Sequence, residues 1–358
     1  MLSKRRLFPL SLAFLNGKVY LKDSLIQIKS INGKPINEII DQIIEMIPAD
    51  GFNKTFKYHL INTGGFQEGY AMLFGEPEEF LIDGNDSNNS PVKLKLKAIN
   101  GEEYLKTRTE FQTLIKLSFP ETNTALLSIN SFVISGPAFI SEIAAAFEKI
   151  NSKKSTQLII DLRNNGGGNN ANVSRLYSFL SDKPFYHLRR TEVIGKPLTH
   201  SKYISNYREI SDMGSNPSED GTRNVDFEYR GRNLIPPASQ DVFKGKLIVL
   251  ANGGTGSAAS EFVALVHGNK RGLIVGEETA GCYYGSTGGT YARLVLPNTG
   301  INVTIPMVRI YNAVPEDFNK QPPGRGTLPD YEVPMTLADL NNSDRDRWVE
   351  FALKLFKK

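Results

Sequence analysis

Cysteine is almost absent from this 358-residue chain: Cys282 is the single example, so no disulfide can form within the chain. The cysteine content therefore does not indicate whether the protein works in an oxidising or a reducing compartment. Long hydrophobic runs are also missing, and no stretch approaches the roughly 20 residues of a membrane-spanning helix. Charge of one sign is not concentrated, because 42 Lys and Arg against 38 Asp and Glu give a net charge of +4 with scattered basic residues. These absences argue against a membrane span and against nucleic acid binding as the main function.

The overall composition, 40% hydrophobic and 22% charged, is typical of a globular protein. The length is sufficient for two domains. The N-terminus, residues 1–16, is interpreted as a leading segment. Its basic residues at 4–6 and apolar residues at 7–15 fit either a short signal peptide or a strand with basic flanks. No small-residue cleavage site follows and residues 18–21 continue like a strand, which favours the second interpretation.

Residues 17–120 are predicted to form a small β-rich module. Apolar residues alternate over residues 25–31 and Asn32-Gly33 is a turn signal. A helix is expected over residues 36–46, and the alternation of Val, Leu and Lys at 92–97 predicts a half-exposed strand.

Residues 121–358 have a different pattern, in which strands and helices alternate. This pattern predicts an α/β fold with a mostly parallel sheet and flanking helices. Functional sites in such sheets form beyond the carboxyl ends of the strands, where both glycine-rich turns of the chain fall. The expected strands are 125–129, 158–160, 246–251 and 273–275, and the expected helices are 136–150, 171–180 and one that follows Ser257.

Three further segments complete the core. Residues 183–244 interrupt the alternation and are interpreted as a long excursion over the active-site face. Residues 291–296 and 301–305 are predicted to form an antiparallel pair. The chain is expected to end in a helix capped by Ser343, with Trp348 on its apolar face.

The stretch 246–285 carries the strongest chemical signal. It runs from an apolar strand through Asn252-Gly253-Gly254-Thr255-Gly256 to Ser257 and an apolar helix. A strand-turn-helix of this kind exposes a serine hydroxyl beside unpaired backbone N–H groups, so Ser257 is interpreted as a nucleophile. Acyl transfer also needs oxyanion donors, which the N–H of Ala258 and the glycines at 166–168 can supply. Each of the two glycine-rich turns, taken alone, is also compatible with a purely structural strand-to-helix connection. A phosphate-binding P-loop is disfavoured because residues 253–260 lack its lysine.

Several motifs together resemble those of the tail-specific, or C-terminal processing, serine peptidases. They are LIIDLRNNGGG at 158–168, NGGTGSAASEF at 252–262, GEETAG at 276–281, GRGTLPD at 324–330, and IKSINGKP at 28–35, which resembles the end of a PDZ-like module.

This resemblance implies a ClpP/crotonase-like protease core after a PDZ-like module, with no metal or cofactor. It implies a serine-type endopeptidase in which Ser257 attacks the scissile carbonyl and the N–H groups of Gly167 and Ala258 form the oxyanion hole. The polypeptide substrate would be held as an added strand at Gly288, Gly289, Thr290 and Tyr291. Family members mostly work in the cell envelope, periplasmic or secreted. The resemblance does not supply an oligomeric state.

The general base departs from the family pattern. The best-known branch has a lysine 25 residues after the serine, and Cys282 stands there. A second branch takes a histidine from a region before the PDZ-like module, and no such motif precedes Ile28. The chain is therefore a fragment, or its base lies elsewhere, or its activity is impaired. The alternative function is a relative that binds extended peptides or lipids without turnover.

Other candidate groups have mainly structural interpretations. His59, His187, His200 and His267 are expected to be structural, solvated or at a helix end, although His187 and His200 could fold over the site. Cys282 is interpreted as a packed thiol rather than a nucleophile. Ser260 is assigned to the helix face, Glu261 to the helix dipole, and Asp161 with Arg163 to an ion pair that holds the glycine loop.

Overall fold

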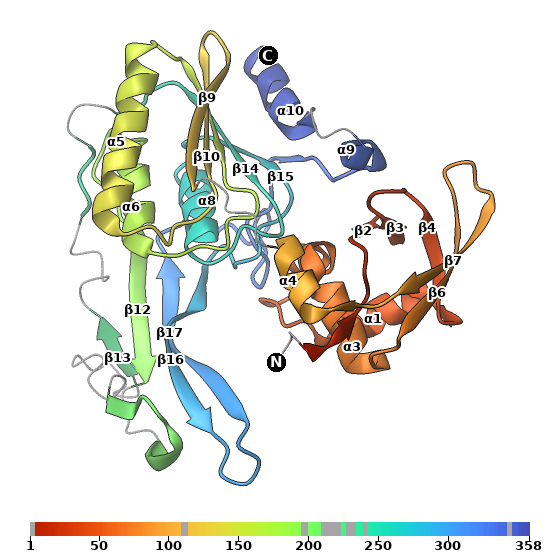
Figure 1. Cartoon of the computed structure of the whole chain (residues 1–358). Coiled ribbons are helices and arrows are strands. Elements are labelled where there is room, and N and C mark those ends of the chain that lie inside the picture. The colour runs from red at the N-terminus through yellow and green to blue at the C-terminus, as the bar shows by residue number, and fades with distance from the viewer. Residues whose placement is uncertain are drawn as a thin grey trace.

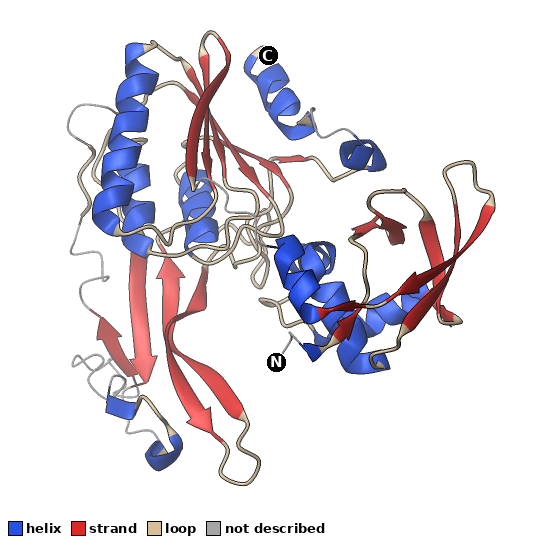
Figure 2. Ribbon diagram, in the orientation of Figure 1, coloured by secondary structure: helices blue, strands red, loops and turns tan. Residues whose placement is uncertain are grey.

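The computed structural model describes residues 4–108, 114–194, 200–208, 223–226, 234–238, 242–341 and 346–358. A β-rich N-terminal module, coloured red to orange, lies beside an α/β core coloured yellow to blue (Figure 1). Figure 2 shows a second layer of long antiparallel strands that extends away from the core sheet. Among the described residues, no helix is both long and apolar enough to cross a membrane.

The module is built on a twisted sheet in the order β2-β3-β4-β6-β7, with β5 paired to β4. Helix α1 covers it because Ile36, Ile39, Ile40 and Ile43 recur on one face. The strands are β2 (Leu12–Leu15), β3 (Lys18–Leu21), β4 (Gln27–Ile31), β5 (Lys34–Pro35), β6 (Glu79–Asn85) and β7 (Pro91–Lys97); the helices are α1 (Ile36–Met46), α2 (Thr55–Leu60), the short turn η2 (Ile61–Gly65), α3 (Phe66–Phe74) and α4 (Gly101–Arg108).

The segment before residue 17 belongs to this module. β1 (Arg6–Leu7) pairs with β8 (Ile99–Asn100), and Phe8 is buried against Phe66 and Phe80. β2 pairs antiparallel with β3, so the strand interpretation of this segment is confirmed. The predicted boundary at residue 16 therefore cuts through the packed structure of the module.

The core sheet has the order β18-β15-β14-β11-β10-β9. All neighbours are parallel except β9, which runs antiparallel to β10, so the predicted α/β fold with a mostly parallel sheet is confirmed. The predicted boundary at residue 120 falls inside β9. The strands are β9 (Ile115–Glu121), β10 (Thr124–Ile129), β11 (Gln157–Asp161), β14 (Lys246–Ala251), β15 (Leu273–Gly276) and β18 (Tyr331–Glu332).

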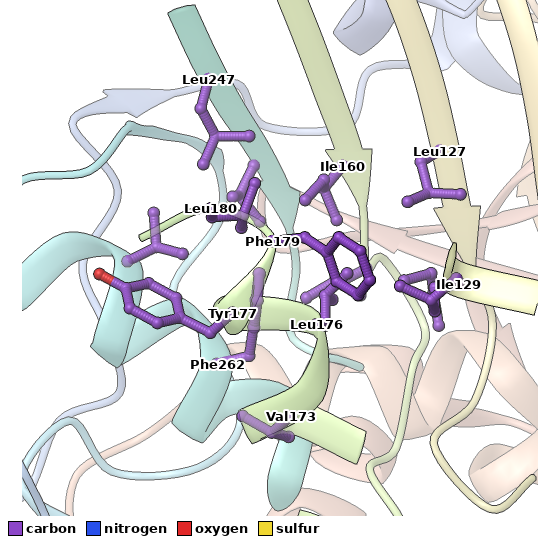
Figure 3. Packing of buried hydrophobic residues seen from close by; sticks show 14 of the residues in the cluster. Leu127, Ile129, Ile160, Val173, Leu176, Tyr177, Phe179, Leu180, Leu247 and Phe262 are labelled. Atoms are coloured by element: carbon purple, nitrogen blue, oxygen red, sulfur yellow. The ribbon is translucent and has the colours of Figure 1, made fainter. Parts of the chain in front are cut away.

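Helices cover both faces of the core sheet. α5 (Gly136–Ser152), α6 (Asn170–Ser178) and α8 (Ala258–Gly268) pack on one face, where Leu127 and Ile160 of the sheet meet Leu176 and Phe262 of the helices (Figure 3). α10 (Arg347–Phe356) packs Trp348 on the other face. Each fully buried aliphatic or aromatic side chain contributes about 1.5–3 kcal/mol, so the two layers hold the strand ends rigidly.

A second sheet, in the order β13-β12-β17-β16, is antiparallel throughout. β16 (Gly285–Val295) and β17 (Asn302–Asn312) contain the predicted pair, and β12 (Leu188–Ile194) and β13 (Arg223–Asp226) come from the predicted excursion. Part of residues 183–244 is thus regular sheet, and much of the rest lies outside the described residues.

The final helix begins later than predicted. Asp346 caps α10, since its carboxylate accepts from the N–H groups of Trp348 and Val349. Ser343, the predicted cap, lies outside the described residues. A short helix, α9 (Leu337–Asn341), precedes it.

Candidate active site

Ser257 stands at the turn between β14 and α8 with its side chain exposed. Its backbone has φ +48° and ψ −128°, a conformation that costs a residue with a Cβ about 1–3 kcal/mol. The strain is maintained because residues 258–266 that follow are all buried and fix the helix start. A strained serine on a strand-turn-helix bend is the geometry of an activated nucleophile.

The glycine loop after β11 approaches this serine closely. Gly167 has φ +105°, and a Cβ placed on it would lie 2.6 Å from Ser257 Cβ and 2.9 Å from the Ala258 amide nitrogen. Position 167 therefore tolerates no side chain. The side chain of Asn165 holds the loop, because its amide nitrogen donates to the Ile129 carbonyl at 2.9 Å.

The expected oxyanion donors are together in space, but they are not equally free. Among the described residues, the Ala258 N–H donates to no acceptor. The Gly167 N–H donates to Asn165 Oδ1 at 2.9 Å, so it would have to break this bond to serve an oxyanion. The N–H of Gly168, which lines the same cleft, has no acceptor among the described residues.

Two motifs that are far apart in the sequence, at 276–281 and 324–330, pack together next to the turn that carries Ser257 (residues 252–257, the serine turn). The Glu278 carboxylate receives two hydrogen bonds from Arg325, at 2.9 and 2.5 Å, and one from the Gly326 N–H at 2.8 Å. This pairing positions Gly281, where a Cβ would lie 2.1 Å from Ser260 Oγ. Ser260 in turn donates to the Ser257 carbonyl at 2.8 Å, which gives it a structural role.

Ser257 opens into a cleft of about 570 Å³, a size usual for ligand sites. Its lining residues come from the glycine loop, α8, β16, β17 and the module: Asp50, Gly168, Asn170, Ser257, Glu261, Gly281, Ser286, Thr287, Gly288, Gly289, Thr290, Tyr291 and Ile310. A larger hollow of about 720 Å³ between α6 and the turn at Lys270 contains none of the predicted site residues.

All four predicted substrate-binding residues line the cleft at an irregularity of β16. Pairing with β17 stops at Gly288 and resumes at Tyr291, and Gly289 has φ +72°. The bulge leaves backbone groups of residues 289 and 290 outside the ladder. Farther along, the outer edge of β16 is covered, because Asn206 donates to the Tyr291 carbonyl at 2.8 Å and the Ser205 N–H donates to the Arg293 carbonyl at 3.0 Å.

Comparisons with known proteins identify the family of the chain. Residues 123–333 match the model of Peptidase family S41. The chain belongs to peptidase family S41. The members of this family are serine peptidases, and the predicted relationship to tail-specific proteases is confirmed.

Two solved structures of CPAF show the same fold at low identity. Mature CPAF superposes with a TM-score of 0.63 at 16% identity over 100% of this chain and 84% of that one. CPAF complexed with lactacystin gives 0.58 at 14% identity over 98% and 82%. The photosystem II D1 C-terminal processing protease gives 0.41 at 16% identity over 92% and 72%. No curated protein matches the sequence.

In this S41 chain, Cys282 does not replace the lysine. The residue lines a neighbouring hollow with Asp50 and Gly51 rather than the Ser257 cleft. Burial, followed by the nearby charges of Asp50 and Glu278, raises the pKa of the Cys282 thiol to about 11. The thiol is neutral at physiological pH, which agrees with the interpretation of a packed side chain.

Three of the four histidines do not line the cleft of Ser257. His59 packs against Gly254 in the serine turn, and burial, with a smaller contribution from Lys22, lowers its pKa. His200 is exposed, and His267 lies 3.1 Å from the Tyr283 hydroxyl at the C-terminal end of α8.

His187 was expected to be solvated, and this expectation is wrong. It is 6% exposed, and its Nε2 lies 3.1 Å from Oε2 of Glu261, one helical turn after Ser257. Sequence reasoning assigned Glu261 only to the helix dipole. The missed signal is that Glu261 is the single carboxylate in a helix whose neighbouring positions are apolar or small.

The ion pair predicted for the glycine loop is present. Arg163 contacts Asp161 at 2.6 Å and also Asp346 of the α10 cap at 2.6 Å. Among the described residues, no group of three His, Cys, Asp or Glu side chains is arranged to hold a metal ion.

Proposed function

We propose that this S41 chain is a serine-type endopeptidase that hydrolyses peptide bonds through an acyl-enzyme on Ser257. The observation that carries the proposal is the exposed, strained Ser257 beside the Ala258 N–H, which donates to no acceptor among the described residues. An oxyanion formed by attack of Ser257 Oγ would be met by a helix N-terminus, which favours negative charge. Gly167 or Gly168 would supply the second donor.

The substrate is proposed to bind as an extended strand beside β16. The bulge at Gly288–Tyr291 supports this, because it directs unpaired backbone groups into the cleft that contains Ser257. Residues 286–290 would provide the pairing edge, since the edge from Tyr291 to Leu294 is already occupied by residues 204–206. Main-chain pairing of this kind gives affinity with little sequence preference.

A second candidate function is binding of extended peptides or lipids without turnover. Among the described residues, neither lysine nor histidine lines the cleft, which favours this alternative. Tight binding of an extended peptide with no cleavage over days would support it.

The test is labelling by a fluorophosphonate probe, which reacts with activated serines. The wild-type chain should be labelled and should hydrolyse fluorescein-labelled casein, whereas Ser257→Ala should do neither. Ser260→Ala is the matched control, because its hydroxyl donates to a carbonyl behind the site, and it should still be labelled. Equal labelling of wild type and Ser257→Ala would contradict the proposal.

A further inference from the structure

Glu261 is a carboxylate in an unusual place. It is only 4% exposed, yet it lines the cleft into which Ser257 opens. Its N–H donates to the Ser257 carbonyl at 3.0 Å, so the two residues are one helical turn, about 6 Å, apart. Both residues line the same cleft, in which a bridging water can connect the two side chains.

The carboxylate is also incompletely paired. Glu261 Oε2 and His187 Nε2 are 3.1 Å apart but poorly aligned, and within the described part of the chain neither atom makes a hydrogen bond. Burial of a charged group without full pairing costs free energy, and such groups cluster at functional sites.

A further contact fixes the histidine. Its Nδ1 lies 2.9 Å from Ser174 Oγ on α6, and both side chains of the His187–Glu261 pair are 5% exposed. The ring therefore presents Nε2 to the carboxylate in a fixed orientation, in the manner of a group that orients a base.

We propose that Glu261 is the general base of the serine reaction and that His187 is a positioning residue for it. The proposal rests on the proposed peptidase function and names the base that the missing lysine leaves unassigned.

In each half of the reaction, Glu261 accepts one proton and gives it up again. As Ser257 Oγ bonds to the carbonyl carbon, its proton passes to Glu261 and the C=O π pair moves onto the oxygen that faces Ala258 N–H. Collapse breaks the C–N bond, and the proton leaves Glu261 for the departing amine. Water then attacks the ester and gives a proton to Glu261, which returns it to Ser257 Oγ as the ester bond breaks.

Two other titratable side chains line the cleft, Asp50 and Tyr291. Asp50 is half-buried and faces the Cys282 amide at 3.4 Å, so it is directed toward the neighbouring hollow. Tyr291 is 43% exposed on β16. Neither is buried and unpaired as Glu261 is, which makes Glu261 the group that needs a chemical explanation.

The test measures the second-order rate of fluorophosphonate labelling and the turnover of fluorescein-labelled casein. Glu261→Gln keeps the shape and removes the basic carboxylate, so both rates should fall about 10²–10⁴-fold while the final labelled fraction stays that of wild type. Glu277→Gln is the matched control: Glu277 is a half-buried carboxylate after β15 that does not line the cleft, and the variant should keep wild-type rates.

His187→Leu tests the positioning role. Without the ring that holds the carboxylate in place, kcat should fall while KM stays that of wild type. His187→Gln, which keeps a polar group beside Glu261, should recover part of the rate, a pattern that a purely structural role would not produce. If Glu261→Gln does not fold, Glu261→Asp carries the test, because the shorter side chain retracts from Ser257 and should be slower.

Unchanged labelling rates in Glu261→Gln would overturn the inference, as would a larger loss in Asp50→Asn or His59→Gln than in Glu261→Gln. Each of these outcomes leaves wild-type labelling intact. Failure of the wild-type chain to be labelled at Ser257 would instead reject the peptidase itself, so the two failures are distinguishable.

Discussion

At the scale of single residues, the site depends on positions where a side chain cannot fit. Gly167 and Gly281 both approach the serine turn so closely that a Cβ would overlap neighbouring atoms. Both glycines are therefore required by packing around Ser257, and Gly167 is required also by its φ of +105°.

Gly167→Ala should test this requirement. The added Cβ would collide with Ser257 Cβ and displace the Ala258 amide, so casein turnover should fall by about 10²–10³-fold, the usual loss for a disrupted oxyanion donor. Gly166→Ala is the control, because no atom lies within 4 Å of its added Cβ, and it should retain activity. Equal rates for the two variants would contradict the assignment.

Cys282 gives a second prediction at this scale. Since its thiol pKa is raised to about 11, its alkylation by iodoacetamide should be slow at pH 7–9 and should rise with a midpoint near pH 11. The raised pKa means that the folded state holds the proton more tightly than the unfolded state. This contribution to stability is present below pH 9 and is lost as the pH rises toward 11. Mass spectrometry of the native chain measures the alkylation, and rapid modification at pH 7 would count against it.

At the scale of elements, α10 is linked to the glycine loop through one carboxylate. Asp346 caps α10 and also pairs with Arg163, which directly precedes Asn164 and Asn165 of the loop. Burial alone would raise the pKa of Asp346, but hydrogen bonds and charge from Arg163 hold it below its usual range. The C-terminal helix thus helps to fix the loop that approaches Ser257.

Asp346→Ala should lower the free energy of unfolding by about 1 kcal/mol for the lost cap, in addition to the lost pairing with Arg163. Asp346→Asn keeps a capping oxygen and should be the milder variant. Because the pKa of Asp346 is depressed, its charge stabilises the fold above about pH 4, and this stability is lost as the pH falls through the folded-state pKa. Urea titrations at pH 7 and pH 3 should show the variants converging on wild type at the lower pH.

At the scale of the whole molecule, the module is docked on the loops that build the site. The Asn53 side chain donates to the Thr279 carbonyl and the Thr55 hydroxyl donates to the Glu278 carbonyl, each at 2.8 Å. These acceptors lie two and three residues before Gly281, which packs against the start of α8. The contact between the module and the core therefore helps to hold the backbone of residues 278–281, which packs next to the serine turn.

Gly253→Ala should weaken this docking, because its Cβ would lie 2.2 Å from the Thr55 carbonyl oxygen. Overpacking of this kind costs about 1–3 kcal/mol. Trp348, the single tryptophan, reports unfolding of the core, and circular dichroism reports both units. In wild type the urea unfolding transition followed by tryptophan fluorescence should coincide with the one followed by circular dichroism. In Gly253→Ala the two transitions should separate. Gly136→Ala, with open space around its Cβ, should behave as wild type.

The amino-acid sequence by itself predicted most elements of the core sheet and pointed to Ser257 as the candidate nucleophile. Periodicity gave α1 over Ile36–Met46 without error, because four isoleucines mark one face, and it placed the strands that end at Asp161 and Ala251. The family and the fold followed from the motifs at Gly167 and Ser257. Local patterns carry this information because secondary structure and turns depend on neighbours in the chain.

Only the tertiary structure decided which distant groups meet. His187 approaches Glu261 because β12 pairs with β17 and α6 supplies Ser174, and no local pattern specifies that pairing. Asp346 pairs with Arg163, which lies 183 residues earlier in the chain. The Gly167 amide donates to the Asn165 side chain, a contact that the glycine motif alone does not predict. The physical reason is that such contacts arise from long-range packing, in which residues far apart in the chain share one buried volume.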